Sequence, residues 1–316
     1  MQKYISKLKI MESQNQTPQK DYSLPISIVI GAVFIAGAWI YSARFNSPPS
    51  PADSAKTAAG LAEIVSPKKG FTIPVNWGDL GARLSEAGVI DAGRFEELMA
   101  NRGEFNQTAK EMLYGADNKK IVITPDNANT LLNFFWALGL GNKNEILEQG
   151  PMNQYGNTGQ FASTGGWTLA KGNPSLGLGA GVMDHYSMHQ FINLTPEQQQ
   201  LVSEVSQNIY RPCCNNPTHF PDCNHGMAML GLLELMASQG ASREEMYQTA
   251  LKVNAYWFPD QYLTIAQFLK SKNIDWEKTS PEKILAREFS SGSGFEWVSN
   301  QVVKPEESEQ KGGCAV

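Results

Sequence analysis

Apolar residues recur at helical spacing along most of the chain from residue 64 onward, which predicts a mainly α-helical fold. Leu80 and Leu84 belong to one such stripe. Asp91 precedes a second, shorter helix that runs through Phe95, because an Asp at this position caps the first turn. The first half of the chain is therefore expected to begin with short helices.

A strongly apolar helix is predicted after Thr124, Pro125 and Asp126, because Pro is common in the first turn of a helix. It is expected to stop at Gly139 or Gly141. The residues just before it, in "KKIVIT", favour a short strand.

Three later helices are predicted from their capping residues, Thr195, Ser242 and Ser280. Thr195 and Ser280 are each followed by Pro and Glu, and Ser242 opens a capping box, "SREE". The helix after Thr195 is expected to continue to Ile209. In "GMAMLGLLELMASQG", Glu234 is the only charge, which predicts a helix that is buried nearly all round.

The segment "YSLPISIVIGAVFIAGAWIYSA" carries no charge and is long enough to cross a bilayer core of about 30 Å as a helix. The apolar region of a signal peptide is shorter, about 7 to 15 residues, so a retained single-pass anchor is expected at 23–43. Four lysines precede this segment and only Arg44 follows closely, which places the N-terminus in the cytoplasm. The sequence therefore predicts a cell-membrane protein with the bulk of its chain in the periplasm or outside the cell.

Residues 150–182 are rich in glycine and lack periodicity, which predicts a long loop that covers a site. The Pro-, Ser- and Ala-rich residues that follow the anchor predict a flexible spacer. The expected organisation is a cytoplasmic tail (1–22), a transmembrane anchor (23–43), a linker (44–63), a helical subdomain (64–150), a Gly-rich loop (151–182), a helical Cys/His subdomain (183–303) and a disordered tail (304–316).

Composition narrows the classes of partner. Hydrophobic residues make up 41% of the chain and charged residues 18%, as in an ordinary globular protein. The net charge of −5 argues against binding to nucleic acid, which normally needs a basic patch. The membrane is the one partner that the sequence indicates, and no protein partner is identified.

The stretch "PCCNNPTHFPDCNHG" holds the chemistry that stands out. It contains three of the chain's four cysteines and two of its four histidines. The candidate site residues are Cys213, Cys214, His219, Cys223 and His225, with His185, Met188 and His189 of "MDHYSMH" as additional candidates.

Redox chemistry is one reading of this stretch. Cys213 and Cys214 are adjacent, and a trans peptide holds their Cα atoms about 3.8 Å apart, closer than the usual disulfide spacing. Either one can pair with Cys223, which leaves one thiol over. Cys223 also precedes an apolar helix, whose N-terminus favours a thiolate, and the nearby Asp222 opposes this effect.

Metal binding is the second reading, because thiolates and imidazoles are the ligands of zinc and copper. Methionines close in sequence would bias such a site towards copper(I). The spacing differs from that of a standard zinc finger. A structural disulfide remains a third reading of the same residues.

Residues 197–262 resemble the thiol-oxidoreductase subunit of cytochrome c maturation (the CcmH type). The likeness lies in "IYRPCCNN", "PDCN", "MAMLGLLELMASQGASREEM" and "YWFPDQY". That family has a small three-helix bundle with a Cys-x-x-Cys in the loop after the first helix, is membrane-anchored and handles haem-ligating cysteines. Here Cys-Cys replaces Cys-x-x-Cys, and because this adjacent pair cannot easily close, Cys223 with Cys213 or Cys214 is the better redox couple.

The sequence thus supports three hypotheses for function. The first is a membrane-anchored extracytoplasmic protein whose Cys/His site binds copper or zinc. The second is a thiol–disulfide oxidoreductase of the cytochrome c maturation type. The third is a non-enzymatic interaction domain with a disulfide staple.

Overall fold

The computed structural model describes residues 51–117, 120–155 and 182–302. Among these residues, no helix combines the length and the apolar character that a membrane crossing requires. The predicted cytoplasmic tail and anchor (1–43), most of the Gly-rich loop (156–181) and the C-terminal tail (304–316) lie outside the described residues, so these predictions remain predictions.

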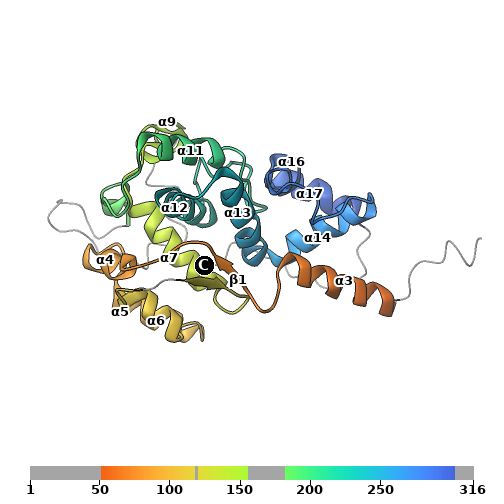
Figure 1. Ribbon diagram of the computed structural model, residues 1–316, viewed down its shortest axis with the longest axis horizontal. Coiled ribbons are helices and arrows are strands. Elements are labelled where there is room, and N and C mark those ends of the chain that lie inside the picture. Colours follow the sequence, from red (N-terminus) through yellow and green to blue (C-terminus); the bar gives the residue numbers. More distant parts are fainter. Residues whose placement is uncertain (1–50, 118–119, 156–181, 303–316) are drawn as a thin grey trace, which may run out of the picture. The chain divides into compact units, whose positions relative to one another are not determined.

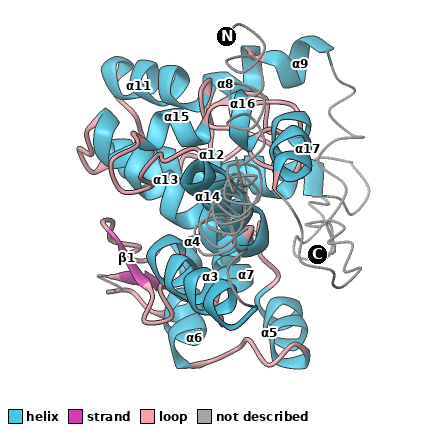
Figure 2. Ribbon diagram, turned by 90° about the vertical axis from the view of Figure 1, so that its right-hand side faces the viewer, coloured by secondary structure: helices cyan, strands magenta, loops and turns pink. Residues whose placement is uncertain are grey.

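The predicted mainly helical character is confirmed, and Figure 2 shows helices with one small pair of strands. The described elements, labelled where there is room in Figure 1, are α3 (Pro51–Val65), β1 (Phe71–Ile73), α4 (Leu80–Glu86), α5 (Ala92–Asn101), α6 (Gln107–Tyr114), β2 (Ile121–Ile123), α7 (Ala128–Gly141), α8 (Glu145–Gln149), α9 (Pro151–Tyr155), the 3-10 helix η3 (Val182–His185), α11 (Pro196–Ser206), α12 (Asn224–Ser238), α13 (Arg243–Trp257), α14 (Pro259–Ser271), α15 (Pro281–Leu285), α16 (Arg287–Ser290) and α17 (Gly292–Gln301).

The core is centred on α7 and α12, which lie against each other (Figure 1). Their backbones meet at two glycines. A Cβ atom at Gly139 would lie 2.1 Å from the carbonyl oxygen of Met227, and one at Gly231 would lie 2.4 Å from that of Phe135. Because real side chains do not fit in these gaps, both glycines are required for the close approach. The two predicted helical subdomains therefore share one core.

The two strands form an antiparallel pair in which Phe71 lies opposite Ile123. The strand at "KKIVIT" is thus confirmed as β2. Its partner β1 has only three residues and carries no alternating pattern long enough to be predicted.

The capping residues hold most helix starts where the sequence predicts them. Thr195 and Ser242 form complete capping boxes, and the side chains of Asp91 and Ser280 accept backbone hydrogen bonds. One end differs: α11 stops at Ser206 instead of continuing to Ile209. The carbonyl oxygen of Ile209 accepts the backbone N–H of Thr218, which the Cys/His loop supplies in place of a helical donor.

The expected linker over 44–63 is corrected in its second half, where the chain forms α3. Alanine and lysine are good helix formers, and Pro51 suits a first turn. The side chains of Leu61 and Val65 are buried in the core, and this burial stabilises the helix. The start of the expected Gly-rich loop is likewise helical, as α9.

Candidate metal centre

The loop between α11 and α12, residues 207–223, is held by hydrogen bonds within itself and to α11 and α17. Within the loop, the backbone N–H and the hydroxyl of Thr218 both donate to the carbonyl oxygen of Ile209, at 2.8 and 3.0 Å. The backbone N–H of His219 donates to the carbonyl oxygen of Ser206 at 3.0 Å. The loop is therefore fastened to the end of α11.

The start of α17 binds the loop at Cys214 and Asn215. The backbone N–H of Gly292 donates to the carbonyl oxygen of Cys214 at 2.7 Å, and that of Ser293 donates to Asn215 Oδ1 at 2.8 Å. These bonds fix the backbone at the Cys-Cys pair. The C-terminal helices thus help to shape the site.

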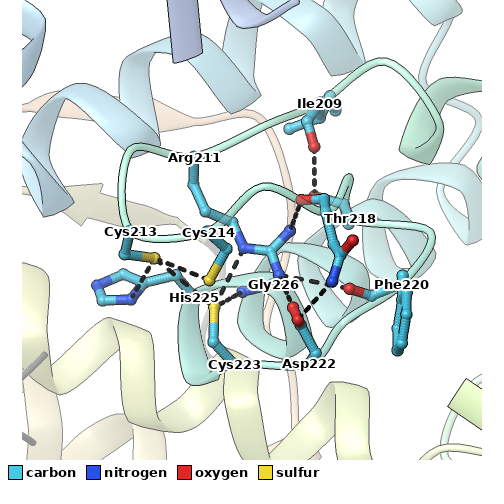
Figure 3. Close-up of polar contacts among 11 residues, drawn as sticks. Ile209, Arg211, Cys213, Cys214, Thr218, Phe220, Asp222, Cys223, His225 and Gly226 are labelled. Atoms are coloured by element: carbon cyan, nitrogen blue, oxygen red, sulfur yellow. Dashed lines mark hydrogen bonds and ion pairs between the residues drawn. The ribbon is translucent and has the colours of Figure 1, made fainter. Parts of the chain in front are cut away.

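Three thiols and one imidazole converge inside this frame (Figure 3). Cys213 Sγ lies 3.4 Å from Cys214 Sγ, 3.7 Å from Cys223 Sγ and 3.9 Å from His225 Nδ1. None of these three cysteines takes part in a disulfide. The imidazole of His225 is held by aromatic contacts, with its ring centre 4.3 Å from that of Phe258. The structure therefore brings four of the predicted site residues together and shows no disulfide among the described cysteines.

The site is built around a buried cation, Arg211, which is 1% exposed. Its Nε donates to Cys223 Sγ at 3.1 Å, and its Nη2 donates to Asp222 Oδ1 at 2.6 Å (Figure 3). Nη1 donates to the carbonyl oxygen of Asn216 at 2.8 Å. A Cβ atom at Gly226 would lie 2.5 Å from Nη2, so only glycine leaves room for the guanidinium at this place.

These contacts shift the pKa values of two of the thiols, Cys223 and Cys214, in opposite directions. Hydrogen bonds from Cys213 and Cys214, together with the charge of Arg211, hold the pKa of Cys223 well below its usual value despite its burial. Cys223 is also the N-cap of α12, and its Sγ accepts the backbone N–H of Gly226 at 3.5 Å. For Cys214, the hydrogen bond with Cys213 acts to lower the pKa, but the bond to Cys223 and burial raise it to about 12. Cys223 is therefore the thiolate of the group and Cys214 a thiol.

Arg211 remains charged in this setting. Burial acts to lower its pKa, but electrostatic interactions with the sulfurs of Cys223, Cys214 and Cys213 and with the carboxylate of Asp222 outweigh burial and raise the pKa above its usual value.

The other predicted site residues do not join this group in the described part of the chain. His219 contacts Ser206 at the end of α11, with Nδ1 3.2 Å from Oγ, and burial lowers the pKa of His219. His185 Nδ1 lies 2.9 Å from His189 Nε2, and the backbone of His189 is held by Gly141 and Lys143 at the end of α7.

Met188 is 54% exposed on the surface beside His189. Backbone hydrogen bonds hold "MDHYSMH" to the end of α7, so these additional candidates lie there and not with the cysteines.

Arg211 and Asp222 shape the candidate site but are not among the candidate residues that the sequence indicates. They are the only charged residues between Glu204 and Glu234. A lone pair of opposite charges in a stretch without other charges is a signal that could have indicated a buried ion pair. Asp222 was expected to oppose the Cys223 thiolate, but in the structure it binds Arg211.

Comparison of the chain with protein-family models, curated proteins and solved structures finds no match.

Proposed function

We propose that Cys213, Cys223 and His225 bind one soft transition metal ion, copper or zinc, with Cys214, whose thiol proton is released when the metal binds, as a fourth ligand. The separations of the donor atoms carry this proposal. In a tetrahedral site with metal–sulfur bonds of about 2.3 Å, two sulfurs lie about 3.8 Å apart, and a sulfur and a nitrogen lie slightly closer. The distances of 3.4, 3.7 and 3.9 Å from Cys213 Sγ are close to these values.

The surroundings of the donors suit a metal ligand set. A metal needs a deprotonated thiol, and Arg211 stabilises the thiolate of Cys223 through a hydrogen bond to its sulfur. The contact of the His225 ring with Phe258 presents Nδ1 to the sulfurs. Hydrogen bonds of this kind, from a neighbouring residue to a ligand atom, orient the ligands in other metal sites.

The proposed place of this site is the outer face of a cell membrane, with the chain anchored by residues 23–43. This part of the proposal rests on the uncharged segment and on the lysines that precede it. A periplasmic reporter fused to the C-terminus should be active, and activity of a cytoplasmic reporter instead would contradict the orientation.

Metal content tests the proposal directly. The chain should be purified without oxygen, stripped with a chelator, and given one equivalent of zinc(II) or copper(I). Close to one metal ion per chain should remain after desalting. Cys213→Ser and His225→Ala should each lose most of it, whereas His219→Ala, in the same loop but outside the ligand group, should retain it. Equal retention by all three variants would contradict the proposal.

A second function, thiol–disulfide exchange, is favoured by the contact of Arg211 with Cys223 and the low pKa of this thiol. In that reaction the Cys223 thiolate attacks a disulfide of a substrate protein, forms a mixed disulfide and releases one substrate thiolate. Cys213, 3.7 Å away, then attacks Cys223 Sγ, closes the Cys213–Cys223 disulfide and releases the second substrate thiol. The substrate disulfide gains two electrons, and the cysteine pair loses them.

The two functions give different results in a glutathione redox titration. A redox protein should be metal-free and should show a Cys213–Cys223 disulfide that exchanges with glutathione at a measurable potential. A chain that binds no metal and contains an inert disulfide would contradict both functions and support the stapled interaction domain.

A further inference from the structure

A cavity of about 710 Å³ lies between α8, the segment 190–194 and one face of α11. Its size falls in the range of about 300 to 1,000 Å³ that is typical of small-molecule sites. Gln199, Gln200 and Ser203 line it from α11, and His219 closes one side. None of the four proposed metal ligands belongs to the described lining, so this site is independent of the proposed function.

The wall of this cavity is dominated by carboxamides, which both donate and accept hydrogen bonds. They are Asn144, Gln149, Gln190, Asn193, Gln199 and Gln200. Ile192 and Leu194 add apolar surface between them. Such a wall matches a ligand whose groups also donate and accept, as hydroxyl groups do.

The charged groups of the wall are largely compensated. Lys143 Nζ lies 3.8 Å from Glu148 Oε1, and Glu204 forms an ion pair with Arg243, while Glu145 adds one further negative charge to the wall. Lysine is represented once in the described lining, so a phosphate or a carboxylate would find little positive charge. This balance favours a neutral ligand.

One carboxamide, that of Gln199, is oriented by a part-buried hydrogen bond that continues into a buried network. Gln199 Nε2 donates to Asn144 Oδ1 at 3.0 Å, and this oxygen also accepts the backbone N–H of Ile146 at 2.8 Å. Asn144 Nδ2 in turn donates to Glu234 Oε1 at 2.5 Å. Because its nitrogen is engaged with Asn144, Gln199 presents its Oε1 as an acceptor for a ligand hydroxyl.

We propose that this cavity binds a neutral, hydroxyl-rich ligand of the saccharide class. Gln199 is the binding residue, and Asn144 and Glu234 are positioning residues that act through it. The proposal follows from the carboxamide wall, the compensated charges and the fixed orientation of Gln199.

Calorimetric titration of the full chain tests the proposal, in a detergent without a sugar headgroup so that the detergent does not compete. The probes are glucose, N-acetylglucosamine, maltose and sucrose, with glucose 6-phosphate and glucosamine as charged derivatives. At least one neutral sugar should bind, and the charged derivatives should bind about tenfold more weakly or not at all. Binding of none of the neutral sugars, or equal or tighter binding of the charged derivatives, would overturn the proposal.

Two variants and a control locate the binding. Gln199→Ala should weaken the binding of the sugar about tenfold. Ser203→Phe should block it by filling the cavity, and it leaves the chain of hydrogen bonds from Gln199 to Glu234 intact, so it remains informative if Gln199→Ala does not fold. Gln248→Ala, an exposed glutamine on α13 that donates to Glu244, should bind as the parent does. Unchanged binding by both Gln199→Ala and Ser203→Phe would place the sugar elsewhere and refute this site.

Discussion

Two buried ionisable groups, Arg211 and Glu234, lie near opposite ends of α12, and their surroundings differ. Arg211 lies beside the N-terminus of α12, where Cys223 and Asp222 supply negative charge. Glu234 lies in the last part of the helix, where Asn142 Nδ2 and Asn144 Nδ2 donate to its two oxygens. Arg211 therefore has charged partners, whereas Glu234 accepts hydrogen bonds from neutral carboxamides.

This difference shows in the ionisation of the two groups. Arg211 is held in its charged form by the anions around it, and it in turn favours the Cys223 thiolate. Burial raises the pKa of Glu234 well above its usual value, and the hydrogen bonds from Asn142 and Asn144 only partly offset this. The surroundings of Arg211 thus stabilise a charged group, the Cys223 thiolate, whereas Glu234 orients the neutral side chains of Asn142 and Asn144.

The largest expected effect is the loss of Arg211. Arg211→Met leaves the carboxylate of Asp222 and the thiolate of Cys223 without their cation, and should lower the free energy of unfolding by about 3 to 5 kcal/mol. Urea denaturation measures this change. The double variant Arg211→Met/Asp222→Asn should recover part of the loss, and an equal loss in the double variant would show that the ion pair is not the cause.

Gly226→Ala should have the next largest effect, because its Cβ would lie 2.5 Å from a guanidinium nitrogen that is packed on all sides. Overpacking of this kind costs about 1 to 3 kcal/mol. Gly60→Ala, in α3 with no atom within 4 Å of the new Cβ, is the matched control and should be neutral or slightly stabilising. If both variants unfold at the same urea concentration as the parent, Gly226 is not needed to accommodate Arg211.

A smaller effect is expected from pH at Glu234. Because the pKa of Glu234 is raised in the folded protein, the folded state binds this proton more tightly than the unfolded chain does. Its contribution to stability is full below the unfolded pKa and is lost as pH rises through the folded pKa. The slope between the two pKa values is up to about 1.4 kcal/mol per pH unit.

Glu234→Gln should remove this slope. Urea denaturation of the parent and the variant at a series of pH values from 4 to 8 measures the difference, which isolates Glu234 from the thiols and histidines. Parallel curves for the two proteins would show that Glu234 does not titrate differently on folding.

Most helix starts could be predicted from the sequence because they depend on local interactions. A capping side chain such as that of Thr195 or Ser242 bonds to a backbone N–H three residues away, so the signal lies within one turn. The burial of α12 was likewise predictable, because Glu234 is the only charge in an apolar run. By contrast, α17 begins with "GSG", which favours a turn, and it is held in place by contacts with Asn215 and Cys214 from a distant loop.

The candidate site could be predicted only in part, for the same reason. The clustering of cysteines and histidines in the sequence indicated the site, and four of the candidates do converge. The direction in which a loop histidine points is set by tertiary partners, Ser206 for His219 and Phe258 for His225, and the sequence spacing of the two residues contains no such information. The role of Arg211 likewise depends on the fold, which brings Gly226 and Asp222 to its guanidinium.

X-ray absorption spectroscopy of the zinc-reconstituted chain tests the central claim most directly, because it reports the atoms bound to the metal. The site formed by Cys213, Cys223, His225 and Cys214 predicts three sulfur neighbours at about 2.3 Å and one nitrogen neighbour at about 2.0 to 2.1 Å. The nitrogen contribution should be lost in His225→Ala and retained in His219→Ala. A spectrum with oxygen and nitrogen neighbours only, or one that the Cys213→Ser and Cys223→Ser substitutions leave unchanged, would contradict the account.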